Sequence, residues 1–233
     1  MLDKKMEDDK KTVHKHFYLN KILLIIFFVG STLLLEYIYE VTNTTTILPR
    51  EDVFPSWISS LDASILVQIN PALTNPLLNT IFFVVTQMGR VSVVILFSLL
   101  FYFFGYKKES ILIVISLLIG TIAIFLLKEL ISRPRPFLTL PTIIPFINEL
   151  GTSFPSGHST RLFVFSAVVT RKLSLFSSCL YLLSLLVAFS RLYLGIHYPL
   201  DVFFGAILGW TIGKITLKQE KRIIDFVSNF VPF

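Results

Sequence analysis

Long apolar runs alternate with short polar stretches along the chain, and six of the runs approach the length of a membrane-crossing helix. Lipid offers no partners to backbone N–H and C=O groups, so a spanning run of this kind must form a helix. The predicted spans are roughly 21–39, 77–104, 110–130, 159–170 with its flanks, 173–190 and 200–217. The pattern therefore predicts an all-α, polytopic membrane protein with about six transmembrane helices in a bundle.

The second run is interrupted by Gly89-Arg90, which predicts a short or re-entrant helix before a span at 91–106. No Gly/Ser-rich or Pro-rich linker divides the chain, so one domain is expected at 21–217. Residues 1–20 and 218–233 are expected to be cytoplasmic tails. The apolar run that begins at Ile22 lacks a small-x-small cleavage site, so it is interpreted as a retained anchor.

Charge and composition agree with a membrane protein. Of the 233 residues, 54% are hydrophobic, and the formal net charge is +6. The lysines and arginines lie in short loops between apolar runs, which is typical of residues that set topology and not of a nucleic-acid site. Cys179 is the single cysteine, so neither an intramolecular disulfide nor a paired thiol ligand can form.

The basic residues also orient the bundle. The N-terminal tail, Lys107-Lys108, Arg171-Lys172 and residues 214–222 all fall on one side of a six-span arrangement, which predicts cytoplasmic termini. The opposite, extracytoplasmic side then receives segments 40–76, 128–158 and 190–201. A weakly amphipathic stretch at 61–69 in the first of these segments is expected to lie along the membrane interface.

Three short strings on that extracytoplasmic side carry the candidate chemistry: KELISRPRP at 128–136, FPSGHS at 154–159 and SRLYLGIHYPLD at 190–201. Each lies where an apolar helix meets a loop. Folding the helices into a bundle can therefore bring all three strings to one interfacial cavity that is rich in hydrogen-bond donors.

The first two strings are typical of an anion site. Lys128 is costly near the end of a span unless it meets a partner or a ligand, and two prolines hold Arg135 on a stiff extended segment. Taken alone, either cation could simply reach out to lipid headgroups. Ser156 and Gly157 precede a helix start, where free N–H groups bind anions, and His158 follows as a candidate proton donor.

The third string pairs an imidazole with a carboxylate. Asp201 follows His197 by four residues, and a carboxylate hydrogen-bonded to one ring nitrogen leaves the other nitrogen free to act as nucleophile or base. His197 is thus the candidate nucleophile. A second interpretation is that Asp201 only stabilises the start of the sixth helix.

Together the strings read Lys-x6-Arg-Pro, Pro-Ser-Gly-His and Ser-Arg-x5-His-x3-Asp, which resembles the type 2 phosphatidic-acid phosphatase superfamily. The resemblance implies that His158 is the general acid, that His197 attacks phosphorus to form a phosphohistidine, and that Asp201 orients His197. It implies a phosphate site made of Lys128, Arg135, Ser156, Gly157 and Arg191, and it implies neither a metal nor another cofactor. Arg133 and Arg161 fall on no motif letter and are expected to lie outside this site or to contact headgroups.

A site at the membrane surface beside apolar helices favours a lipid phosphate or diphosphate substrate, with membrane lipids as the other partners and no nucleic acid. Among the substrates that the resemblance implies, a polyprenyl (undecaprenyl-type) diphosphate comes first, and phosphatidylglycerol phosphate or phosphatidate second. A haloperoxidase-like enzyme and a non-catalytic scaffold or transporter remain as alternatives from other classes. The sequence leaves the oligomeric state open.

Overall fold

The computed structural model describes residues 21–37, 40 and 53–229, and this part of the chain contains helices and no strands. The prediction for the tail at 1–20 lies outside the described residues, as does all of segment 41–52. After a first helix at 21–37, the helices are α2 (Ser56–Leu73), α3 (Pro76–Gln87), α4 (Val91–Phe103), α5 (Lys107–Ile131), α6 (Pro136–Thr139), α7 (Gly157–Val169), α8 (Ser177–Tyr193), α9 (Pro199–Lys218) and α10 (Glu220–Ser228). A 3-10 turn at Ser174–Phe176 precedes α8.

Three of the described segments are long and apolar enough to cross a membrane: Lys107–Thr139, Ser174–Tyr193 and Pro199–Lys218. The pair α3 and α4 meets the same criterion jointly, although the two helices are bent by 54° at the break. The break predicted at Gly89-Arg90 is therefore confirmed. The helix at 21–37 and α7 fall short of the length criterion, so the structure supports a polytopic helical bundle without establishing six spans.

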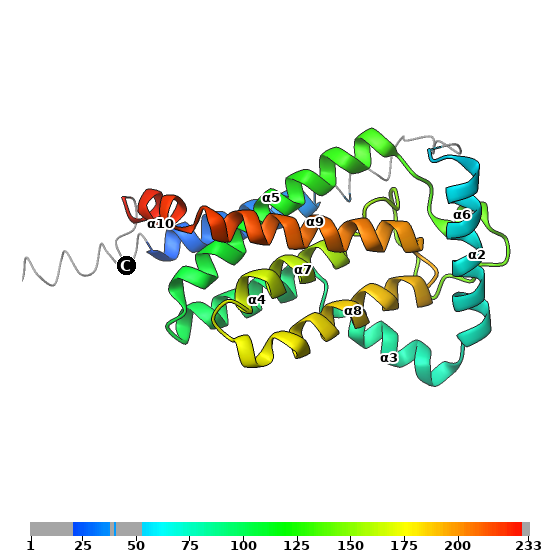
Figure 1. The fold of residues 1–233 in the computed structure, drawn as a ribbon, viewed down its shortest axis with the longest axis horizontal. Coiled ribbons are helices and arrows are strands. Elements are labelled where there is room, and N and C mark those ends of the chain that lie inside the picture. The colour runs from blue at the N-terminus through cyan, green and yellow to red at the C-terminus, as the bar shows by residue number, and fades with distance from the viewer. Residues whose placement is uncertain (1–20, 38–39, 41–52, 230–233) are drawn as a thin grey trace, which may run out of the picture.

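Two segments are more regular than the sequence suggested. About half of the supposed 40–76 loop forms helix α2, which stands across the end of the bundle (Figure 1). The supposed C-terminal tail begins with helix α10. The mixed charges of α10 hid its apolar side, on which Ile224 and Val227 are buried against the bundle.

Helix α7 lies at the centre of the bundle and packs most extensively against α9 (Figure 1). Gly205, Gly209 and Gly213 recur every fourth residue on α9 and face α7, where an added Cβ on Gly209 would lie 2.1 Å from the carbonyl oxygen of Thr160. Small residues at this spacing let two helix backbones approach closely inside a membrane. The pairing holds the first residues of α7 beside the first residues of α9.

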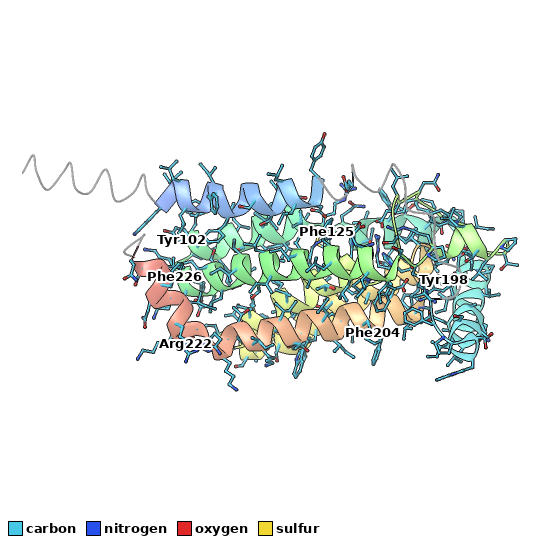
Figure 2. All side chains as sticks on the ribbon, turned by 90° about the horizontal axis from the view of Figure 1, so that it is seen from above. Tyr102, Phe125, Tyr198, Phe204, Arg222 and Phe226 are labelled. Atoms are coloured by element: carbon cyan, nitrogen blue, oxygen red, sulfur yellow. The ribbon has the colours of Figure 1, made fainter. Side chains whose placement is uncertain are left out.

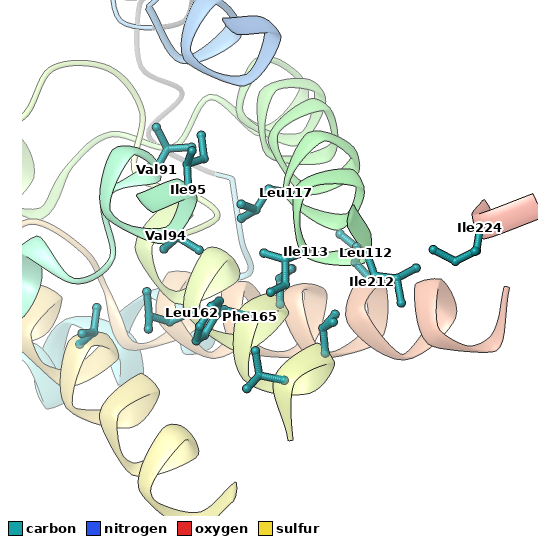
Figure 3. Close-up of a cluster of buried hydrophobic side chains, with 14 residues drawn as sticks. Val91, Val94, Ile95, Leu112, Ile113, Leu117, Leu162, Phe165, Ile212 and Ile224 are labelled. Atoms are coloured by element: carbon teal, nitrogen blue, oxygen red, sulfur yellow. The ribbon is translucent and has the colours of Figure 1, made fainter. Parts of the chain in front are cut away.

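The buried apolar core lies on the other faces of α7 (Figure 3). Val94 of α4, Ile113 and Leu117 of α5 and Phe165 of α7 form its centre, and each is at most 7% exposed. Apolar side chains also cover much of the outer surface (Figure 2), as expected for helices that face lipid.

The close contact between α7 and α9 makes a prediction about stability. Gly209→Ala should lower the free energy of unfolding by about 1–3 kcal/mol, because the new methyl group overlaps the Thr160 backbone. Gly30→Ala is the matched control, since nothing in the described part of the chain lies within 4 Å of its added Cβ. Thermal unfolding in detergent measures both variants, and equal midpoints would contradict the assigned packing.

Candidate active site

The three strings meet at the end of the bundle where α7 and α9 begin. The Ser156 N–H donates to the Asp201 carbonyl oxygen at 3.0 Å, which joins the second string directly to the third. A cavity of about 580 Å³ opens beside this junction. Five of the eight predicted site residues line it, namely Lys128, Arg135, Gly157, His158 and His197, whereas Ser156, Arg191 and Asp201 are fully buried and do not line it.

The local chain path fixes Arg135. Helix α5 ends at Ile131, Ser132 turns the chain with a positive φ of 50°, and the extended segment before Pro136 carries Arg135 inward. Its guanidinium donates to the carbonyl oxygens of Leu150, Gly151 and Ile196 at 2.9, 3.2 and 3.0 Å. These bonds hold the guanidinium at the cavity wall, where Nη1 lies 3.3 Å from Nε2 of His197.

His197 and Asp201 lie together, although not at close hydrogen-bonding distance. His197 Nδ1 is 3.5 Å from Asp201 Oδ2, and that oxygen also accepts the Tyr198 N–H at 2.9 Å. Asp201 thus caps the start of α9, as the second interpretation expected, while facing His197. Burial, reinforced by the positive charges of Arg135 and Arg191 and opposed by Asp201, lowers the pKa of His197 to about 3. The imidazole is therefore neutral near pH 7, as a nucleophile must be.

Arg133, which the sequence left outside the phosphate site, is a buried connector. Its guanidinium pairs with Asp201 at 2.7 Å and with Asp62 of α2 at 2.6 Å, and it stacks 3.8 Å from the centre of the Tyr198 ring. Arg133 is only 5% exposed, so of its two expected positions the one outside the phosphate site is confirmed and the headgroup contact is wrong. Asp62 also accepts the Leu200 N–H at 2.8 Å, which ties α2 to the start of α9.

Glu149 is a member of the site that no sequence motif indicated. Its carboxylate pairs with Arg135 at 3.0 Å and with Arg191, and it lines the cavity. Burial would raise its pKa, but Arg191 and Arg135 outweigh burial and hold the pKa of Glu149 well below its usual range. An acidic residue therefore lies between two cations that were predicted to bind phosphate.

Of the remaining predicted residues, Lys128 and His158 line the cavity, and Ser156 and Arg191 are buried outside its lining. Lys128 donates to the Thr152 carbonyl oxygen, and His158 packs so tightly against Gly89 that an added Cβ there would lie 2.6 Å from the ring. The hydroxyl of Ser156 accepts the Ser159 hydroxyl at 3.2 Å inside the protein, and its binding to an anion stays a prediction. Arg191 donates to the Thr86 hydroxyl at 3.0 Å from behind the cavity wall. Within the described ranges, no group of three His, Cys, Asp or Glu side chains is arranged to hold a metal ion.

Comparison with known proteins places this geometry among relatives. A family model described as the PAP2 superfamily matches residues 109–225, half of the chain. The undecaprenyl-diphosphatase BcrC of Bacillus subtilis is 27% identical over 66% of this chain and 81% of its own length. The bacitracin transport permease protein BcrC of Bacillus licheniformis is 31% identical over 48% of this chain, which spans 64% of that relative. The crystal structure of LpxE from Aquifex aeolicus superposes with a TM-score of 0.65 and 28% identity over 73% of this chain and 99% of LpxE.

The cluster of Arg133 with Asp62 and Asp201 leads to a prediction about stability that does not depend on activity. Arg133→Gln should destabilise the protein by about 3–5 kcal/mol, because it leaves two buried carboxylates without their shared cation. Arg171→Gln breaks the exposed pair with Glu220 and should cost about 1 kcal/mol or less. Thermal unfolding compares the two. Adding Asp62→Asn to Arg133→Gln should restore part of the loss, and no restoration would mean that Asp62 carries no charge in this pair.

Proposed function

Because the chain belongs to the PAP2 superfamily, we propose that it is an integral-membrane phosphatase that hydrolyses the phosphate or diphosphate headgroup of a lipid. One observation carries the proposal: His158 and His197, from two strings 39 residues apart, line the same cavity with Lys128 and Arg135. Two imidazoles and two cations around one volume supply a nucleophile, an acid and the charge that a phosphoryl group requires.

In the proposed reaction, neutral His197 attacks phosphorus and forms a P–N bond as the bond to the leaving oxygen breaks. His158 gives its proton to that oxygen. Water, deprotonated by His158, then cleaves the P–N bond and releases phosphate. Arg135 and Lys128 neutralise the phosphoryl oxygens during both steps, in the role that electrostatic groups have in phosphoryl transfer. Asp201 and Arg133 hold His197 and its neighbouring loop in place.

The cavity wall supports a lipid substrate. Beside the charged groups, the lining includes Leu33 of the first helix, Val91 of α4, and Ile124 and Phe125 of α5. An apolar wall that continues from a cationic pocket suits a headgroup attached to a hydrocarbon chain. We assign a polyprenyl diphosphate as the substrate, with support from the name of the Bacillus subtilis relative, an undecaprenyl-diphosphatase.

The proposed topology has six spans: the first helix, the bent pair α3 and α4, and helices α5, α7, α8 and α9. Lys107 begins α5 and Arg171 follows α7, both at the end of the bundle away from the cavity. Basic loops mark the cytoplasmic side, so the proposed active site faces the extracytoplasmic side. The two tails would then be cytoplasmic.

A transport role, which the printed name of one relative indicates for that protein, is less well supported. A transporter without catalysis has no need of a neutral histidine beside a carboxylate and a second histidine in the same cavity. The two possibilities differ in whether the purified protein releases phosphate.

The direct test is turnover of a polyprenyl diphosphate and of phosphatidylglycerol phosphate by the purified full-length protein in detergent, measured as released phosphate. His197→Ala should lower kcat by about a thousandfold or more, because it removes the nucleophile. Arg171→Gln, at the far end of the bundle, should leave turnover unchanged.

The controls separate the alternatives. A chelator should have no effect, and peroxide with halide should give no oxidation. Full turnover by His197→Ala would refute the mechanism. Faster turnover of phosphatidylglycerol phosphate than of the polyprenyl diphosphate would assign phosphatidylglycerol phosphate as the substrate instead.

The position of Glu149 leads to a second prediction, which concerns phosphate binding at the same site. A phosphoryl group that binds Arg135 and Arg191 must displace this carboxylate, which its depressed pKa keeps charged at neutral pH. Glu149→Gln should therefore tighten binding of inorganic phosphate about tenfold. Asn148→Ala, on the same cavity wall, is the control. Calorimetry measures the dissociation constants, and weaker binding by Glu149→Gln would show that the carboxylate mainly positions the two arginines.

A further inference from the structure

The cavity extends well beyond the groups that one phosphoryl group requires. Its volume of about 580 Å³ is typical of a site for a whole ligand headgroup, for which about 300–1,000 Å³ is usual. Past Gly157 and His158, the lining continues to Arg161 of α7 and to Glu36 of the first helix. This extension contains a cation that the mechanism above does not use.

Arg161 lies directly beside the reaction centre. Its Nη2 atom is 3.1 Å from the point that a Cβ on Gly157 would occupy, so the guanidinium covers the glycine where α7 begins. Nη1 donates to the Gly89 carbonyl oxygen at 3.1 Å, and Nη2 pairs with Glu36 at 2.8 Å. Nε is buried and has no hydrogen-bond partner among the described residues. The guanidinium of this cavity-lining arginine thus has a donor that no described group accepts.

The partner of Arg161 is exchangeable. The Glu36 side chain is 23% exposed and belongs to the first helix, whereas Arg161 belongs to the central helix α7 and is 11% exposed. By contrast, Arg133 has two buried carboxylates and lines no part of the cavity. Of Arg133 and Arg161, Arg161 is therefore the one that can accept a second anion with less rearrangement.

We propose that Arg161 forms a second phosphoryl subsite that binds the lipid-proximal phosphoryl group of a diphosphate substrate and takes it in exchange for Glu36. This inference rests on the proposed function and specifies the substrate class. The two phosphoryl groups of a diphosphate share one bridging oxygen, so the second must lie directly beside the first. A guanidinium fork next to Gly157 meets that requirement and matches the oxygens of a phosphate.

The subsite also has a chemical role. His197 attacks the terminal phosphorus, the bond from that phosphorus to the bridging oxygen breaks, and the electron pair of this bond stays on the bridging oxygen. The leaving group is therefore the lipid monophosphate, whose bridging oxygen takes a proton from His158 and whose other phosphoryl oxygens keep their negative charge. Arg161 stabilises this charge. With a lipid monophosphate substrate the leaving group is the lipid alcohol, which carries no second phosphoryl group and gains nothing from the subsite.

The experiment compares a prenyl diphosphate with the monophosphate of the same prenol, using the full-length protein in detergent. Arg161→Gln should lower kcat/KM for the diphosphate about tenfold or more and change that for the monophosphate less than twofold. Glu36→Gln removes the competing carboxylate and should lower KM for the diphosphate only. Arg171→Gln is the matched control, an arginine removed from an ion pair outside the cavity.

A charge swap separates this role from a structural one. Arg161→Glu combined with Glu36→Arg keeps an ion pair between the first helix and α7 but removes the cation from beside Gly157. The swap should keep monophosphate turnover and stability close to those of the wild type, whereas diphosphate turnover should stay as low as in Arg161→Gln. Recovery of diphosphate turnover would overturn the subsite and assign the pair to helix packing.

Failure of this inference differs from failure of the proposed function. If the wild type hydrolyses both lipids and Arg161→Gln lowers kcat/KM equally for both, the Glu36→Gln variant distinguishes the subsite from a structural role of Arg161. If Glu36→Gln also lowers kcat/KM for both lipids, the subsite is overturned and the proposed function stands. If Glu36→Gln lowers KM for the diphosphate, the subsite is supported. If the wild type releases no phosphate from either lipid, the proposed function fails and the subsite falls with it.

Discussion

The active-site geometry depends on the close approach of α7 and α9. Three glycines on α9 let the two backbones meet without side chains between them, and the Ser156 N–H then reaches the Asp201 carbonyl oxygen. This contact places the helix start that carries His158 beside the helix start that carries Asp201. Neither helix could supply the site alone, because each contributes residues from its first turn or from the loop just before it.

Burial raises the cost of every charge in this site, and the structure meets that cost with paired groups. Arg133 is shared by two carboxylates, and Glu149 is shared by two guanidinium groups. Each arrangement compensates charges that would otherwise be buried unpaired. The difference lies in access, since Glu149 lines the cavity and the Arg133 cluster does not. The first arrangement can exchange a carboxylate for a phosphate, whereas the second is part of the framework.

The sequence predicted the helical class, the break at Gly89-Arg90 and the meeting of three distant strings, because each leaves a local pattern: an apolar run, a Gly before a polar residue, or a motif at a helix end. It missed Glu149, Asp62 and the buried role of Arg133, because these depend on pairings between residues 14 to 71 positions apart that no local pattern records. Helix α2 was hidden by its prolines and weak amphipathicity. The roles of the individual site residues remain predictions.

The loop between α6 and α7 holds the cationic groups through its backbone. The carbonyl oxygens of Leu150 and Gly151 accept the Arg135 guanidinium, and that of Thr152 accepts Lys128. A carbonyl oxygen is supplied by any amino acid, so Leu150 and Thr152 can be exchanged for many others without removing an acceptor. Inserting or deleting a single residue here would shift all three acceptors out of register at once. At Leu150 and Thr152, chain length therefore constrains the protein more tightly than side-chain identity does.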